Sequence, residues 1–122
     1  AGDRFAITYF QTFTPTDQDL FAGTWDLWGI VVDGFGTSEE RYDHFMIDTF
    51  VHEGPICTRG GACVGPIDRS LLDFFESDLT PEGNLVVVYP ADSTTGLKEI
   101  EIRVAIQNGG TPLATSLKSE ST

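Results

Sequence analysis

The chain is predicted to be an all-β protein of antiparallel strands, and two observations predict this class. Short runs rich in Phe, Ile, Val and Tyr alternate with polar segments that carry Gly, Pro, Asn or Asp. Aromatic and β-branched side chains suit a pleated sheet, and Gly, Pro and Asn suit the turns between strands. No run has the length and the 3.6-residue period of a long amphipathic helix. Strands and turns in this succession indicate a meander.

The first part of the chain, residues 1–53, contains three predicted strands that form a first meander. These strands are 4–12 (RFAITYFQT), 25–33 (WDLWGIVVD) and 44–52 (HFMIDTFVH). A polar, acidic loop separates the first two strands. The segment 34–43 holds a turn and a charged stretch, which could form a single turn of helix.

Residues 71–117 are expected to form a second meander, with strands at 71–79, 85–89, 98–107 and 111–117. The first of these runs (LLDFFESDL) fits a helix as well as an inner strand. The second (LVVVY) has no polar face, which predicts a central, buried strand. The third (KEIEIRVAIQ) alternates charged and apolar side chains, so we expect one wet face and one dry face. Residues 118–122 are a polar tail.

Between the meanders, the loop over 54–70 contains the only two cysteines, Cys57 and Cys63. A zinc site would need two further ligands at suitable spacing, and a redox pair is more often C-x-x-C. We therefore expect a disulfide that closes this glycine-rich loop. A disulfide implies an oxidising compartment, and hence a secreted, extracellular protein.

The net charge of the chain limits the classes of molecule that it is expected to bind. Its 19 acidic and 7 basic side chains give a formal charge of −12. Such a surface repels phosphate backbones and anionic membranes, so nucleic-acid binding is not expected. No apolar run reaches the about 18 residues of a membrane-spanning helix, so no membrane insertion is expected. Cations, basic proteins and neutral sugars are acceptable ligands, and the acidity can also serve solubility alone.

Three segments resemble the sialidase-like β-propellers, the family with bacterial neuraminidase or Asp-box repeats. GPICTRGGAC followed by DRSLLDFFESDLTPEGNLVVVY is similar to a cysteine loop and inner strand of secreted members. GTWDLWGIVVDGFGT and IQNGGTPL are similar to the third strand of a blade that runs into an Asp-box turn. The resemblance covers residues 3–113.

In this family the Asp box is a Ser-x-Asp-x-Gly-x-Thr-Trp turn between the third and fourth strands of a blade. By resemblance, Asn108 and Gly110 stand where its Asp and Gly would stand, and Leu113 replaces its Trp. In the other copy Asp33 is in place, but Gly36 comes one position late. Both copies depart from the family pattern.

The resemblance implies two consecutive blades of a propeller, each a four-stranded antiparallel meander. A blade needs about 40–50 residues and a ring needs at least about four blades, so two blades would leave sheet edges unpaired. Further blades would come from the same parent chain or from neighbouring subunits. The alternative is a stand-alone β-sandwich that imitates the spacing of blades.

Members of the family bind the substrate carboxylate with three arginines and use a tyrosine nucleophile, a glutamate and an aspartate. Arg69 is the best candidate for such an arginine, because it precedes the predicted inner strand. Asp73, Glu76 and Asp78 are candidate carboxylates, and on a strand Glu76 and Asp78 share one face. The complete catalytic set is not found. These residues can also pair with one another, cap turns or face water.

The acidic residues Asp17, Asp19 and Asp26 make calcium the one cofactor to consider, although the spacing of an EF-hand is absent. The alternative for them is a solvated loop. Trp25 and Trp28 lie three positions apart and so face opposite sides of a strand, one in the core and one available to stack on a sugar. His44 and His52 are expected to be ordinary polar residues at strand ends.

Two functions follow from these observations. The first is a segment of a secreted sialidase-like β-propeller that hydrolyses or binds extracellular glycans. The second is a non-catalytic extracellular structural or interaction module that assembles with other chains through the edges of its β-strands.

Overall fold

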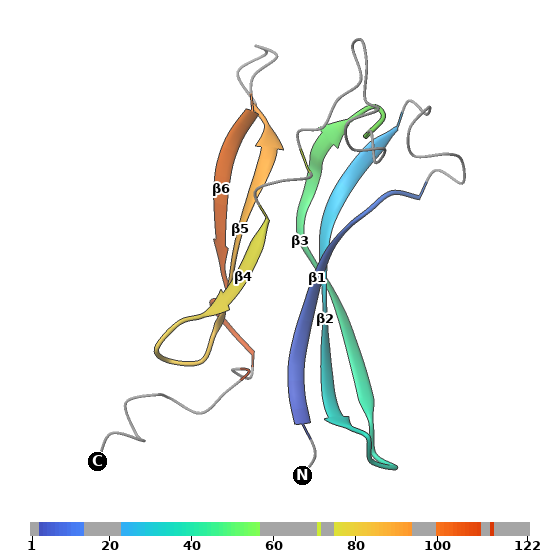
Figure 1. Cartoon of the computed structure of the whole chain (residues 1–122), viewed down its shortest axis with the longest axis vertical. Coiled ribbons are helices and arrows are strands. Elements are labelled where there is room, and N and C mark those ends of the chain that lie inside the picture. The colour runs from blue at the N-terminus through green and yellow to red at the C-terminus, as the bar shows by residue number, and fades with distance from the viewer. Residues whose placement is uncertain are drawn as a thin grey trace, which may run out of the picture.

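The computed structural model describes residues 3–13, 23–56, 71, 75–93, 100–110 and 113, and in this part of the chain it is all-β. The strands are β1 (Asp3–Gln11), β2 (Thr24–Phe35), β3 (Arg41–Glu53), β4 (Glu76–Leu79), β5 (Leu85–Asp92) and β6 (Ile100–Ile106). They form two antiparallel sheets, β1-β2-β3 and β4-β5-β6, each in chain order (Figure 1). The predicted class and the meander order are confirmed.

The four-stranded meanders that we expected are not seen, because each sheet has three strands among the described residues. The predicted strand 111–117 lies outside the described residues except for Leu113, which sits in a bend. Its N–H donates to the carbonyl of Gly83 over 2.8 Å. Leu113 therefore attaches to the β4–β5 turn and not to the edge of β6.

The turns explain where several strands end. Gly34 and Gly36 have φ angles of 67° and 81°, in the left-handed region that favours glycine, and the Thr37 N–H donates to the Gly34 carbonyl over 3.0 Å. This turn replaces the helical turn that was considered for 34–43. Between β4 and β5, residues 80–84 form a turn in which Gly83 has a φ of 85°. Of the run 71–79, only Glu76–Leu79 is a strand among the described residues.

The two sheets pack face to face around one core (Figure 1). β1 lies beside β4, where the Phe10 and Phe75 rings are 4.8 Å apart and the Thr8 and Ser77 hydroxyls are hydrogen-bonded at 2.5 Å. The fully buried core consists of Leu27, Val51, Leu85, Val87, Tyr89 and Ala91. Burying an aliphatic side chain of this size stabilises the fold by roughly 1.5–3 kcal/mol, so this core holds the two layers together.

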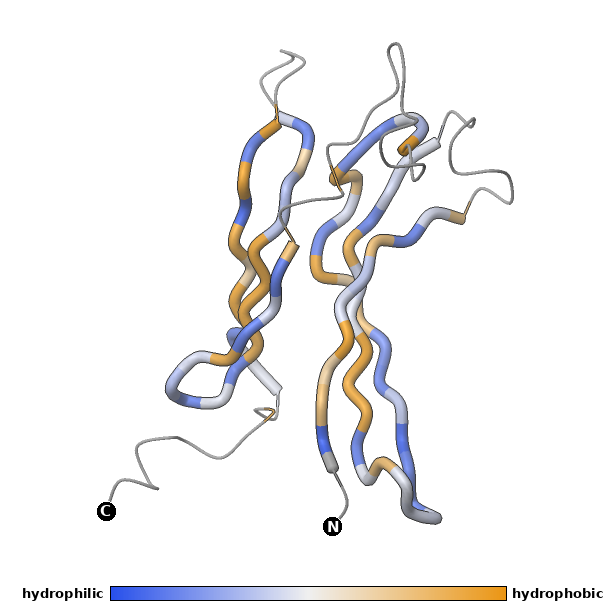
Figure 2. Tube along the Cα trace, viewed as in Figure 1, coloured by the Kyte–Doolittle hydropathy of each residue, from blue (hydrophilic) through white to orange (hydrophobic). Residues whose placement is uncertain are grey.

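β5 is the central strand of its sheet, as predicted for 85–89, but it is not buried on both faces. Leu85, Val87 and Tyr89 point into the core, whereas Val88 on the opposite face is 37% exposed. Figure 2 shows apolar residues that follow one another along β5 and that alternate with hydrophilic ones along β6. No helix in the described part of the chain is long and apolar enough to cross a membrane.

The alternation of β6 is confirmed, but its two faces lie opposite to what polarity suggests. The side chains of Arg103 and Glu101 point between the sheets and are partly buried. The apolar side chains on the other face are 53–59% exposed; they are Ile100, Ile102, Val104 and Ile106. The face of β6 that was expected to be dry is therefore the exposed one.

Candidate binding groove between the sheets

A groove runs along one side of the sandwich, between β3 and the β5–β6 hairpin. Two cavities of about 500 Å³ and 310 Å³ occupy it, and both are lined by Phe45, Leu85, Gln107 and Gly109. Because β3 and β6 each pair with only one neighbour among the described residues, two strand edges border this groove. Unpaired strand edges carry backbone donors and acceptors that can accept a further strand.

The floor of the groove depends on a contact between Gly29 on β2 and Phe45 on β3, which are cross-strand partners. A Cβ atom built on Gly29 would lie 2.5 Å from Cζ of the Phe45 ring. The ring thus lies directly over the Gly29 backbone, where no other residue type leaves room for it. Phe45 therefore contributes an apolar surface to the groove at this point.

One end of the groove is charged with both signs. Arg4, Asp33, Arg41 and Asp43 line the larger cavity together with Tyr42. Arg41 Nη2 lies 3.6 Å from Asp33 Oδ2, and the two side chains are 80% and 43% exposed. An ion pair this exposed contributes at most about 1 kcal/mol, so it does not lock this end of the groove.

A polar cluster joins the two sheets farther along β3, and it is formed by Asp48, Tyr89, Glu101 and Arg103. Arg103 Nη1 donates to Asp48 Oδ2 over 2.9 Å, and its Nε and Nη2 both donate to Glu101 Oε1, over 2.8 and 2.6 Å. The Tyr89 hydroxyl donates to the same Asp48 oxygen over 2.7 Å. We call these four residues the inter-sheet clamp.

The clamp raises the pKa of two of its members, Tyr89 and Arg103. Burial, the hydrogen bond to Asp48 and the Asp48 charge raise the pKa of Tyr89 to about 12, against a smaller lowering by Arg103. The pKa of Arg103 is also raised, first by its hydrogen bond to Glu101 and then by Asp48, although burial acts the other way. Tyr89 therefore stays a neutral donor and Arg103 a cation across the ordinary pH range.

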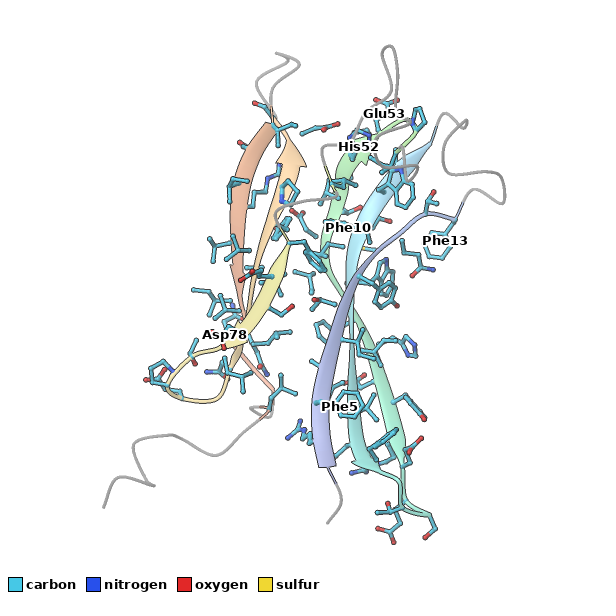
Figure 3. All side chains as sticks on the ribbon, viewed as in Figure 1. Phe5, Phe10, Phe13, His52, Glu53 and Asp78 are labelled. Atoms are coloured by element: carbon cyan, nitrogen blue, oxygen red, sulfur yellow. The ribbon has the colours of Figure 1, made fainter. Side chains whose placement is uncertain are left out.

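A second inter-sheet contact lies beyond the clamp, near the end of β3 (Figure 3). His52 is 2% exposed, and its Nδ1 lies 2.9 Å from Asp92 Oδ1 on β5. The backbone N–H of Glu53 donates to Asp92 Oδ2 over 3.2 Å. His52 thus lies near the end of a strand, as expected, but its side chain is buried, whereas His44 is exposed on β3.

The candidate catalytic carboxylates lie away from the groove. Glu76 and Asp78 on β4 are exposed, and their cross-strand partners Val88 and Val86 place them on the outer face of the sheet (Figure 3). Neither forms an ion pair with another described residue. Arg69 and Asp73 lie outside the described residues, as do Cys57 and Cys63.

Asp26, the only described member of the calcium candidates, supports a bulge in β3. Its Oδ1 accepts the Phe50 N–H over 2.7 Å and the Thr49 hydroxyl over 3.0 Å. Phe50 has a φ of 54°, which is uncommon for a residue other than glycine, and these bonds hold it there. No group of three or more His, Cys, Asp or Glu in the described part is arranged to hold a metal ion. Asp17 and Asp19 lie outside that part.

The Asp-box-like residues lie near or beyond the ends of strands. Asp33 is in β2, paired with Arg41 on β3, and Gly36 lies in the β2–β3 turn; Asn108 and Gly110 follow β6, where Gly110 has a φ of 72°. Leu113, which stands in the place of the family's Trp, packs against the core.

The two tryptophans lie on opposite sides of β2, as predicted. Trp25 packs against the core and donates Nε1–H to the Gly54 carbonyl over 2.9 Å. Trp28 lies on the other side, with the Phe13 ring 6.4 Å away in an edge-on arrangement. Phe13 therefore lies next to the ring that was considered as a sugar platform.

No protein-family model, no curated protein and no solved structure matches the chain. The sialidase-like resemblance therefore stays a prediction that rests on the sequence motifs.

Sequence reasoning did not identify the residues that form the groove and the clamp. The one signal was Arg103, a cation in the middle of the alternating run 98–107. Alternation places it on one face of the strand with Glu101, but the period alone does not say whether that face points to water or to another sheet.

Proposed function

We propose that the chain is a non-catalytic extracellular interaction module that binds an extended peptide segment in the groove between β3 and β6. The observation that carries this proposal is that two unpaired strand edges, those of β3 and β6, border a groove with an apolar floor. A segment that adds to a sheet edge gains backbone hydrogen bonds along its length, and pockets for alternate side chains provide its specificity. The groove offers such pockets beside Phe45 and beside Val87 and Ala105.

The composition of the groove favours one kind of segment. Its apolar floor suits alternate Val, Ile or Leu side chains, and the formal charge of −12 favours basic residues at the ends of the segment. The inter-sheet clamp holds β3 and β6 at a set separation, so little ordering is required of the module itself on binding. The partner strand would also supply the fourth strand that a blade-like meander was expected to contain.

A synthetic heptapeptide, acetyl-Lys-Val-Thr-Val-Thr-Val-Lys-amide, tests the proposal by NMR titration of the isotope-labelled chain. We expect saturable amide shift changes along β3 or β6 and around Gly109. The matched control is the same peptide with alternate backbone amides N-methylated, which removes one row of donors and should abolish the shifts. Shifts that are absent, or that survive N-methylation, contradict strand addition.

Two substitutions on β6 locate the binding site. Ala105 lines the groove, whereas its neighbour Val104 points to the opposite face of the same strand. Ala105→Trp should block the peptide by filling the cavity, and Val104→Trp should leave the peptide shifts unchanged.

A sialidase-like propeller segment that acts on or binds glycans is the second candidate. It is favoured by the meander order of both sheets and by the positive φ of Gly36 and Gly110 at the two Asp-box-like turns. Under this candidate the further sheets come from the parent chain or from neighbouring subunits. Turnover of a fluorogenic sialoside, lost in Glu76→Gln or Asp78→Asn, would support it. Absence of turnover by the longest polypeptide that contains this segment would contradict its enzymatic form.

A further inference from the structure

An asparagine-glycine pair, Asn108 and Gly109, follows the end of β6, and a second glycine, Gly110, comes after it. All three residues are exposed. Asn108 lines the smaller cavity of the groove, and Gly109 lines both cavities. A chemical change at this pair would therefore take place in the wall of the groove.

The two groups of this pair that can react with each other are not engaged elsewhere. Within the part of the chain that the structure describes, no hydrogen bond or ion pair holds the side-chain amide of Asn108 or the N–H of Gly109. A Cβ atom built on Gly109 would meet nothing within 4 Å, so the space around this residue is open. Since glycine adopts many backbone conformations, the Gly109 nitrogen can approach Cγ of Asn108.

Asn84, the other asparagine of the chain, carries the same amide in a different setting. The residue after it is Leu85, which is 7% exposed and whose N–H donates to Gln107 Oε1 over 3.0 Å. The backbone of Asn84 is also held, because its N–H donates to Thr80 Oγ1 over 3.1 Å and its carbonyl accepts the Thr80 N–H over 2.8 Å. The backbone nitrogen that would have to attack the Asn84 amide is therefore already bonded.

We propose that Asn108 is a site of spontaneous deamidation. The Gly109 nitrogen, once it has lost its proton, attacks Cγ of Asn108; this N–C bond closes a succinimide ring, and the side-chain nitrogen leaves as ammonia. Water then opens the ring at either of its two carbonyls. One opening gives aspartate, and the other gives isoaspartate, in which the backbone runs through the side-chain carbon. The reaction consumes one water and releases one ammonia, so it needs no oxidant and no enzyme.

Both products change the wall of the groove, and the effect on binding rests on the proposed function of the groove. Each product replaces a neutral amide by a carboxylate. Isoaspartate also adds a carbon to the backbone between Gln107 and Gly109, where Gln107 Nε2 donates to the Gly109 carbonyl over 2.8 Å. The same Gln107 side chain accepts the Leu85 N–H, so a shift of Gly109 disturbs the lining of both cavities.

The two products should act on peptide binding in different ways. Isoaspartate should weaken binding of the heptapeptide, because the longer backbone displaces Gly109 and its bond to Gln107. Aspartate keeps the original backbone, and its carboxylate attracts the lysine ends of the peptide, so this form should bind at least as tightly as the unmodified chain.

Storage of the complete chain in buffer, followed by peptide mapping with mass spectrometry, tests the site. We expect aspartate and isoaspartate to accumulate at position 108, and to do so faster at mildly alkaline pH, because the attacking nitrogen must lose its proton. Labelling by an isoaspartyl-specific methyltransferase identifies the second product. Asn84 should stay unmodified over the same period.

Two variants test the chemistry of the site. Asn108→Gln keeps the amide but lengthens the side chain by one carbon, which disfavours ring closure, so position 108 should stay unmodified. Gly109→Ala adds a Cβ that restricts the backbone, and it should slow the modification severalfold while keeping the fold. Absence of isoaspartate at position 108, equal modification of Asn84, or an unchanged rate in Gly109→Ala would overturn the proposed site.

Titration of the separated forms with the heptapeptide tests the effect on the groove. Weaker binding by the isoaspartate form, with undiminished binding by Asn108→Asp, supports it. Equal binding by the isoaspartate form and the unmodified chain overturns it. If no form binds the peptide, the proposed function fails and the effect on binding fails with it, whereas the mass spectra still decide whether Asn108 is modified.

Discussion

Tyr89 and Asp48 connect the two sheets through a hydrogen bond of 2.7 Å, in which the phenol of β5 donates to the carboxylate of β3. Tyr89 is 4% exposed and belongs to the apolar core, whereas Asp48 also accepts from Arg103. The bond therefore links the core to the inter-sheet clamp and sets how closely the groove strands approach.

This bond predicts a loss of stability at high pH. The pKa of Tyr89 is raised to about 12 from a reference of 10.0, so between these values the unfolded chain loses the phenol proton before the folded chain does. The full stabilisation is present below about pH 10 and is lost as the pH rises toward 12. The free energy of unfolding should fall by roughly 2–3 kcal/mol at most over this range.

Urea unfolding of the wild type and Tyr89→Phe between pH 8 and 12 measures this dependence. The Tyr89→Phe variant should be less stable than the wild type near neutral pH. Its free energy of unfolding should also fall less steeply between pH 10 and 12. Tyr42, which is 58% exposed, provides the control: Tyr42→Phe should keep the wild-type slope. An unchanged slope in Tyr89→Phe would contradict the assignment.

Arg103 is predicted to stabilise the sandwich far more than Arg41, whose ion pair with Asp33 is exposed. The side chains of Arg103 and Asp48 are 23% and 25% exposed, so removing the guanidinium leaves carboxylates short of a partner in a partly dry site. Arg103→Met should lower the free energy of unfolding, measured by chemical denaturation, by about 2–3 kcal/mol.

The matched control is Arg41→Met, whose partner Asp33 and own side chain are much more exposed. It should cost less than about 1 kcal/mol. A double-mutant cycle of Arg103→Met with Asp48→Asn should show coupling, and additive effects would contradict a direct interaction.

Gly29 is predicted to be required for the groove. Gly29→Ala places a methyl group 2.5 Å from Phe45 Cζ, so the ring must leave the floor. We expect a loss of about 1–3 kcal/mol in unfolding free energy and weaker binding of the heptapeptide. Gly109→Ala is the control for the unfolding free energy alone, since nothing lies within 4 Å of its added Cβ but Gly109 lines the groove. Combining Gly29→Ala with Phe45→Leu should recover part of the stability.

Asp26 is predicted to act through the β3 bulge. Asp26→Ala removes the acceptor of two hydrogen bonds and should cost about 1–2 kcal/mol, whereas Asp26→Asn keeps an oxygen in place and should cost less. If calcium also binds here, a chelator should lower the melting temperature of the wild type and have less effect on Asp26→Ala. A melting temperature unmoved by chelator would exclude the calcium role.

Several parts of the fold were predictable because they depend on local chemistry. The runs at 25–33 and 85–89 are strands because β-branched and aromatic side chains suit a pleat, and Gly83 ends the β4–β5 turn because its φ of 85° suits glycine. The placement of Trp25 and Trp28 on opposite sides of β2 follows from the period of two. None of these results needs knowledge of a distant residue.

The candidate site was not predictable, because it depends on residues that are distant from one another in the sequence. Phe45 becomes the floor of a groove only because Gly29 lies beneath it on another strand, and Asp48 meets Arg103 from 55 positions away. His52 gave no signal of burial, because the carboxylate that meets it, Asp92, comes from the other sheet.

The sequence by itself determined the all-β class, the chain order of the strands and the alternation along β6. Only the tertiary structure decided which face of β6 points inward, and it placed Arg103 between the sheets and the isoleucines outside. The physical reason is that a period of two defines two faces without naming the inner one. That choice depends on what the opposite sheet offers, and here Asp48 and Tyr89 offer a carboxylate and a phenol that pair with a charged side chain.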